Sequence, residues 1–103
     1  MELDDLSRRV EAVSSAYAES HGFERTETWY LLKLQEEVGE LTQAYLKRTG
    51  QARANGRSPE ELEAAFRAEL ADVLAHTLLL ARACGVDMPA ELEAKWLWRV
   101  DPA

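Results

Sequence analysis

The sequence is poor in the residues that build cross-links and membrane spans. It holds one cysteine, Cys84, so no disulfide can form within the chain, and no Cys/His cluster of the zinc-binding kind is present. No apolar run approaches the roughly 18 residues that a membrane-spanning helix needs. The first residues, "MELDDLSRRV", are acidic and mixed, unlike a targeting peptide. These absences predict no membrane partner and a reducing compartment, for which we take the cytoplasm.

Positive charge is also scarce. The chain has 12 lysine and arginine residues against 19 acidic ones, which gives a net charge of −7. A surface this negative repels a polyphosphate backbone, so we expect no nucleic acid polymer as a partner. A small anionic ligand is compatible with the charge if a metal ion and a few placed cations offset the local field.

Strand-forming residues are few. Val, Ile and Thr are sparse, Ala, Leu and Glu are abundant, and no stretch alternates between polar and apolar residues. A length of 103 residues with 47% hydrophobic content predicts a single domain, residues 1–103. The pattern predicts an all-α fold, a helical bundle of about four helices completed by subunit association. We place the helices over residues 4–20, 27–48, 59–84 and 87–99.

Capping residues set these limits. Gly22 is expected to end the first helix, and Thr26 or Thr28 to cap the second. The run Ser58–Glu61 has the form of a capping box with proline in the first turn, which predicts the start of the third helix. Asp87 is the expected cap of the fourth helix.

Carboxylates interrupt the apolar stretches of the second and third predicted helices. Glu37 and Glu40 lie in "QEEVGEL", and Glu69 and Asp72 lie in "AELADVLAHTLLLA". Each pair is spaced three residues apart, so its two side chains share one face of a helix. When one pair is superimposed on the other, the apolar stripes beside the two pairs also align. Two such helices packed along their stripes would bring all four acids together.

The surroundings of these acids favour a metal site over a solvated face. An ordinary Glu-x-x-Glu pair lies in water, but residues 29–46 are apolar on most sides, which also indicates that another subunit covers them. Buried carboxylates without partners would protonate. A hard divalent cation bound through oxygen would keep them ionised. We therefore predict that the four acids bind Mg²⁺, with Mn²⁺ as a substitute.

The two acid motifs and the closing stretch "ELEAKWLWR" at 91–99 resemble the MazG-like all-α nucleoside triphosphate pyrophosphohydrolases. The signature of that family is Glu-(Glu)-x-x-Glu on one helix and Glu-x-x-Asp on the next. The resemblance implies Mg²⁺-dependent hydrolysis of (deoxy)nucleoside triphosphates between the α and β phosphates, in the manner of nucleotide-pool house-cleaning. It also implies a homodimer or homotetramer whose nucleotide sites are lined by neighbouring subunits.

The resemblance implies roles for particular residues. Glu37, Glu40, Glu69 and Asp72 would be the metal ligands. Glu36 and Glu37 would serve catalysis, and Glu36 could hold a further metal ion or orient the attacking water.

Four other side chains are candidates for binding the substrate. Lys95 and Arg99 match the lysine-rich closing helix of the family, and they would hold the phosphates. Lys33 is a further candidate for the phosphates, and Trp29 for the base. The alternative for the cations is a solvated surface, and for Trp29 a place in the core or in a subunit interface. His76, one turn after Asp72, is expected to be packed or to partner a ligand carboxylate.

Two other functions fit the same residues. One is a phosphoribosyl-ATP pyrophosphohydrolase, which shares the chemistry and differs in the nucleotide pocket. The other is a non-catalytic acidic helical dimerisation module that would be indifferent to Mg²⁺.

Overall fold

A computed structural model describes residues 2–100 of the chain. The α-helices are α1 (Leu3–His21), α2 (Glu27–Arg48), α3 (Pro59–Ala83) and α4 (Met88–Lys95), and a short 3₁₀ helix, η1 (Leu97–Arg99), follows. No strand occurs in the described part of the chain, which confirms the all-α prediction and agrees with an all-α NTP pyrophosphatase-like fold. None of these helices is long and apolar enough to span a membrane.

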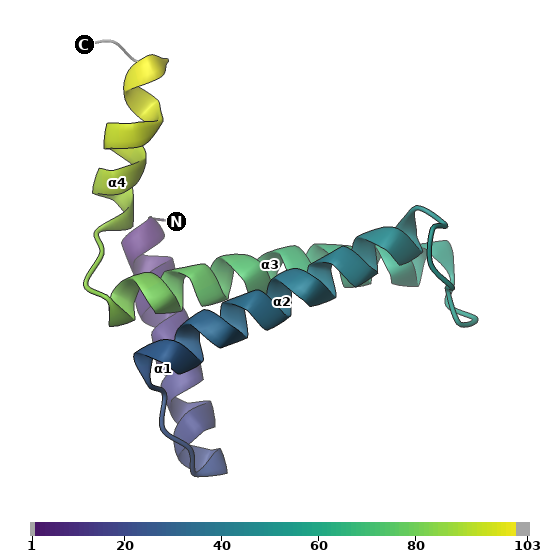
Figure 1. The fold of residues 1–103 in the computed structure, drawn as a ribbon, viewed down its shortest axis with the longest axis horizontal. Helices are drawn as coiled ribbons and strands as arrows, with labels where there is room; N and C mark the ends of the chain where they lie inside the picture. The colour runs from purple at the N-terminus through teal and green to yellow at the C-terminus, as the bar shows by residue number, and fades with distance from the viewer. Residues whose placement is uncertain (1, 101–103) are drawn as a thin grey trace.

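The two longest helices form the body of the molecule. α2 and α3 run antiparallel and lie side by side along most of their length, while α1 crosses them and packs against α3 (Figure 1). α4 projects away from the α2–α3 pair, and its main contact is with η1. The middle of the α2–α3 seam is therefore the place where side chains from two distant segments meet.

The predicted caps start and stop the helices as expected. The hydroxyl of Thr26 accepts a hydrogen bond from the Trp29 amide, and the Asp87 carboxylate accepts one from the Ala90 amide. Ser58 forms the predicted capping box. Gly22, at φ +69°, ends α1 in the left-handed conformation that glycine adopts without strain. The Thr26 bond fixes the start of α2 at the predicted residue.

The predicted fourth helix is shorter than expected. The sequence predicts it over residues 87–99, but α4 ends at Lys95 and the chain continues as the 3₁₀ helix η1. Trp96 and Trp98 are each 57% exposed, so no packing partner among residues 2–100 holds this stretch in an α-helix.

The core of the single chain is small. Its buried apolar members are Ala18, Tyr30, Ala44, Leu62, Leu78, Leu79 and Ala81. Large apolar side chains lie exposed on the outer faces of α2 and α3: Leu31, Leu32, Val38, Leu70 and Leu74. An uncovered apolar surface of this kind is typical of a helical protein that packs against another subunit.

A partly buried ion pair holds α1 to the start of α2. Both Nη atoms of Arg25 donate to the carboxylate of Glu11 at 2.8 Å, and Nη1 also donates to the Ser14 hydroxyl. The Arg25 guanidinium lies over the Tyr30 ring as well. The hydrogen bond from Arg25 lowers the pKa of Glu11.

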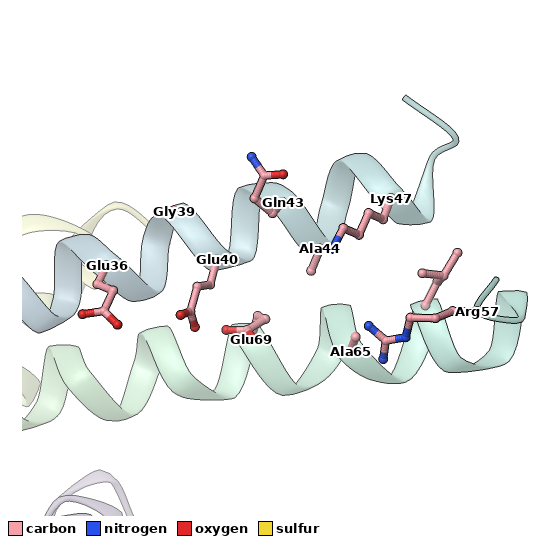
Figure 2. Close-up of a pocket in the computed structure, with 10 residues that line it drawn as sticks. Glu36, Gly39, Glu40, Gln43, Ala44, Lys47, Arg57, Ala65 and Glu69 are labelled. Atoms are coloured by element: carbon pink, nitrogen blue, oxygen red, sulfur yellow. The ribbon is translucent and has the colours of Figure 1, made fainter. Parts of the chain in front are cut away.

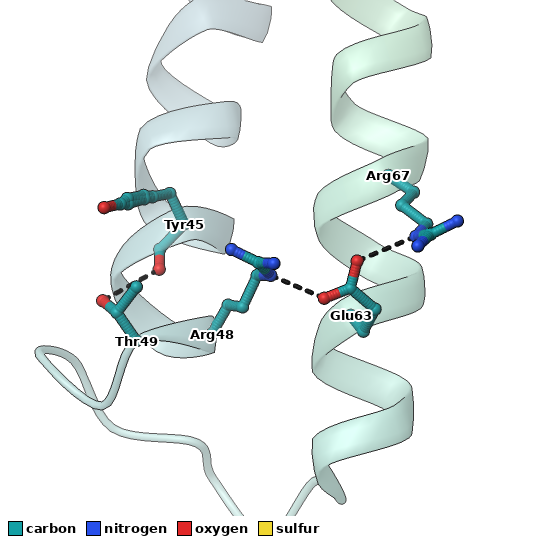
Figure 3. A network of polar contacts seen from close by, with 5 residues as sticks. All are labelled: Tyr45, Arg48, Thr49, Glu63 and Arg67. Carbon is teal, nitrogen blue, oxygen red and sulfur yellow. Dashed lines mark hydrogen bonds and ion pairs between the residues drawn. The ribbon is translucent and has the colours of Figure 1, made fainter.

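A second ion-pair network joins the far ends of α2 and α3. Nε of Arg48 donates to Glu63 at 2.6 Å, and Nε of Arg67 donates to the other carboxylate oxygen at 2.8 Å (Figure 3). The Arg48 guanidinium also lies 4.6 Å from the centre of the Phe66 ring. Arg48 is thus held against α3 by Glu63 and Phe66.

Candidate metal centre

Five carboxylates meet in the middle of the α2–α3 seam. Glu36, Glu37 and Glu40 of α2 form one trio, and Glu37 forms another with Glu69 and Asp72 of α3. In each trio, one ligand oxygen from every residue lies within 4.8 Å of the others. Glu40 and Glu69 face one another across the gap between the helices (Figure 2). The structure therefore brings together all five acids that the sequence singles out, with Glu37 at the centre.

The central carboxylates are buried without enough partners. Glu37 is only 7% exposed, and Oε2 of Glu37 and Oε2 of Glu69 are buried with no hydrogen-bond partner among residues 2–100. Burial raises the pKa of Glu37 to about 7, and the neighbouring Glu40 and Asp72 contribute to the rise. Burial likewise raises the pKa of Glu69. In the absence of a cation, these carboxylates therefore take up protons more readily than ordinary glutamates do.

The donor set fits a hard divalent cation. Every member of the two trios offers carboxylate oxygen, the ligand that Mg²⁺ and Mn²⁺ prefer, and neither trio contains sulfur or imidazole. Cys84, the one cysteine, is exposed and lies near the end of α3, outside both trios. The orphaned oxygens of Glu37 and Glu69 are the groups that such an ion would satisfy.

Two further residues adjoin the acids. Nζ of Lys33 lies 3.5 Å from Oε1 of Glu36 and 3.8 Å from Oε1 of Glu37. Nε2 of His76 lies 3.8 Å from the same Glu37 oxygen, while its Nδ1 is buried with no hydrogen-bond partner in the described residues. Burial lowers the pKa of His76. The structure thus places the predicted Lys33 beside the acids and His76 against the ligand carboxylate.

An apolar cavity of about 900 Å³ opens next to these residues, between α1 and the α2–α3 pair. Its lining includes Lys33 and His76 on the side of the acids, and Trp29, Phe23 and Tyr17 further away. The ring centres of Trp29 and His76 are 6.5 Å apart. Trp29 is therefore in a position to contact a planar ligand that reaches the carboxylates.

A second, smaller cavity of about 350 Å³ lies along the seam on the other side of the acids. Glu36, Glu40 and Glu69 line one end, and Lys47 and Arg57 line the other (Figure 2). In the sequence, Lys47 flanks the second predicted helix and Arg57 lies in a loop that could fold over a nucleotide, but neither is among the four substrate-binding candidates. The helical spacing gave a signal, because Lys47 follows Glu40 by seven residues, or about two turns of helix.

The structure does not bring Lys95 and Arg99 to the acids within one chain. Both are exposed on the projecting C-terminal segment, and neither lines the two cavities beside the carboxylates. The Arg99 guanidinium instead lies over the rings of Trp96 and Trp98. Their predicted contact with phosphate at these acids is therefore not made within one chain.

The fold and this site define a class: an all-helical protein with paired carboxylates on facing helices, suited to a divalent cation, beside an apolar cavity. No family model matches the chain. Over 94 residues, 90% of its length, the chain is 37% identical to human dCTP pyrophosphatase 1. The chain spans 54% of that protein, about half of its length.

Proposed function

We propose that this chain is a MazG-like nucleoside triphosphate pyrophosphohydrolase. Water would attack the nucleotide so that the bond between the α phosphorus and the α–β bridging oxygen breaks, giving nucleoside monophosphate and pyrophosphate. The observation that carries the proposal is the cluster of five carboxylates, with two orphaned buried oxygens, next to an apolar cavity. A role in clearing unwanted nucleotides fits this activity.

The residues have distinct tasks in this proposal. Glu37, Glu40, Glu69 and Asp72 would hold Mg²⁺ or Mn²⁺ through their carboxylate oxygens. A bound ion of this kind supplies positive charge against the phosphates and acidifies water. Glu36 is more exposed than Glu37, with 55% of its side chain accessible against 9%, and it would orient the attacking water and accept its proton.

The nucleotide would be held on both sides of the acids. Lys33, which lies at the boundary between the carboxylates and the apolar cavity, would contact the phosphate nearest the sugar. Trp29 would offer its ring to the base within that cavity. Both tasks follow from the positions of Lys33 and Trp29, because the nucleoside of a triphosphate bound at the acids would lie within reach of these two side chains.

We also propose that the active form is a homodimer or homotetramer in the cytoplasm. The exposed leucines of α2 and α3 would be covered by another copy of the chain. The projecting α4 would then deliver Lys95 and Arg99 to the phosphates bound by a neighbour. Light scattering tests this state: a mass of one chain at micromolar concentration would refute it.

Release of pyrophosphate from a panel of nucleotides tests the activity. The panel contains dCTP, the other common nucleoside triphosphates and phosphoribosyl-ATP, each with Mg²⁺. We expect turnover by the wild type and by Glu19→Gln, a matched change at an exposed acid of α1, and loss of most activity in Asp72→Asn. Circular dichroism shows whether each variant keeps its helix content.

Each outcome of the panel favours one function. Preferential turnover of phosphoribosyl-ATP would favour that activity over the proposed one. A folded wild type that turns over no nucleotide with Mg²⁺ or Mn²⁺ would refute the enzyme and favour the dimerisation module. Undiminished activity of Asp72→Asn would show that the metal site is wrongly assigned.

A further inference from the structure

Both cavities and the acid cluster lie along one continuous seam. On α2 the seam residues follow at spacings of three or four, at positions 29, 33, 36, 40, 43 and 47. On α3 they do the same, at positions 62, 65, 69, 72, 76 and 79, where position 72 belongs to the acid cluster and the others line the cavities. Residues at these spacings share one face of a helix. A ligand lying along the seam would therefore meet the apolar cavity first, then the carboxylates, and then the smaller cavity, or groove, whose far end is lined by Lys47 and Arg57.

The two cations at the far end of the smaller cavity make no salt bridge within residues 2–100. Hydrogen bonding to Ser58 lowers the pKa of Glu61, and Arg57 lies near enough to add to this effect, but Arg57 and Glu61 form no ion pair. Arg48, the neighbour of Lys47, differs because it is bound to Glu63 and Phe66 of α3 and does not line this cavity (Figure 3). Within residues 2–100, Lys47 thus has no salt-bridge partner, whereas the adjacent Arg48 has one.

Arg57 is held in place by its backbone. Its amide donates to the carbonyl of Ala54, and the next residue, Ser58, begins the capping box of α3. The side chains of Lys47 and Arg57 extend back along the groove in the direction of the acids (Figure 2). The groove therefore has a negative end suited to a metal ion and a positive end suited to phosphate oxygens.

From this arrangement we propose that Lys47 and Arg57 form a subsite for the terminal phosphates of the substrate and for the pyrophosphate product. The inference rests on the proposed function, because it assigns a direction to the triphosphate. With the nucleoside in the apolar cavity, the α phosphate lies at the carboxylates and the β and γ phosphates extend toward the two cations. That direction places the bond between the α and β phosphates over the acids and explains why the leaving group would be pyrophosphate.

Binding of inorganic pyrophosphate in excess Mg²⁺, measured by titration calorimetry, tests the subsite directly. We expect Lys47→Gln and Arg57→Gln each to weaken binding about tenfold, the low end for a charge-assisted bond to phosphate in an accessible groove. Arg48→Gln removes the same charge from the adjacent position, and we expect it to bind within about twofold of the wild type, as one lost rim charge does little. Lys47→Arg should restore most of the affinity. Equal binding by the wild type and the two glutamine variants would overturn the subsite.

A kinetic comparison tests the direction of the substrate. The wild type should prefer a nucleoside triphosphate over the diphosphate of the same nucleoside, and both glutamine variants should lose this preference through KM. An unchanged preference would overturn the proposed direction. Hydrolysis by the wild type with unchanged pyrophosphate binding in the variants would refute the subsite alone. Pyrophosphate binding that depends on both cations, in a protein that hydrolyses no nucleotide, would refute the proposed function and leave the subsite supported.

Discussion

Replacing Glu37 with glutamine should make the metal-free protein more stable at pH 8. The pKa of Glu37 is about 7 in the folded protein, against an ordinary value of 4.5. Between these two values the folded chain binds more protons than the unfolded chain, so the free energy of unfolding falls as the pH rises through this window. Glutamine keeps the shape of the side chain but cannot ionise, and the variant should escape this loss.

The structure sets the size of the effect. At about 1.4 kcal/mol for each pKa unit, the raised pKa of Glu37 corresponds to a loss of about 3 kcal/mol on going from pH 4.5 to pH 8. The approach of Glu37 to Lys33 at 3.8 Å lowers this pKa, so its contribution is already included in that loss. We therefore expect a gain of about 3 kcal/mol at pH 8 and almost none at pH 5.

Urea unfolding in the presence of a chelator measures both values. Glu19→Gln serves as the control, because it removes an exposed charge from α1 without touching the acid cluster. Excess Mg²⁺ should reverse the order at pH 8, because only the wild type keeps the full set of ligands. The reasoning fails if metal-free wild type is equally stable at pH 5 and pH 8, or if Glu37→Gln keeps the pH dependence of the wild type.

Three further outcomes are expected. Mg²⁺ at about 100 times its Kd should stabilise the wild type by about 2.7 kcal/mol and raise its melting temperature in a thermal shift assay; an equal rise in Asp72→Asn would contradict the metal site. Arg25→Met should cost about 2 kcal/mol at neutral pH; since Arg25 lowers the pKa of Glu11, this cost should shrink in chemical denaturation as the pH falls through the carboxylate range. Ser58→Ala should cost about 1 kcal/mol in urea unfolding, and an unchanged midpoint would mean that its capping box contributes nothing.

The helix limits that follow from local chemistry were predictable from the sequence. Thr26 caps α2 through a bond to an amide three residues away, so its effect can be inferred from neighbours alone. The end of α4 was not predictable in this way. Whether residues 96–99 continue an α-helix depends on what covers their aromatic side chains, and no neighbour in sequence supplies that information.

The same distinction applies to the site. The spacing of Glu37 and Glu40, repeated in Glu69 and Asp72, is sufficient to predict that the acids meet once two helices pack along their stripes. The roles of the cations depend on contacts made across the chain. Lys47 and Arg48 are adjacent in sequence, yet only Arg48 pairs with Glu63, 15 residues further along the chain, and only Lys47 lines the groove. A partner at that separation cannot be assigned from helical periodicity.

The isolation of α4 from the α2–α3 pair has a genetic consequence. Suppose that the terminal arm of one polypeptide, formed by α4 and η1, completes the site of another. A chain altered at Lys95 and a chain altered at Asp72 can then assemble so that one site contains neither alteration. Two inactive variants, mixed and reassembled, would then regain part of the lost turnover, because some assemblies would combine an intact arm with intact carboxylates. Such complementation would be impossible if each polypeptide supplied its own arm.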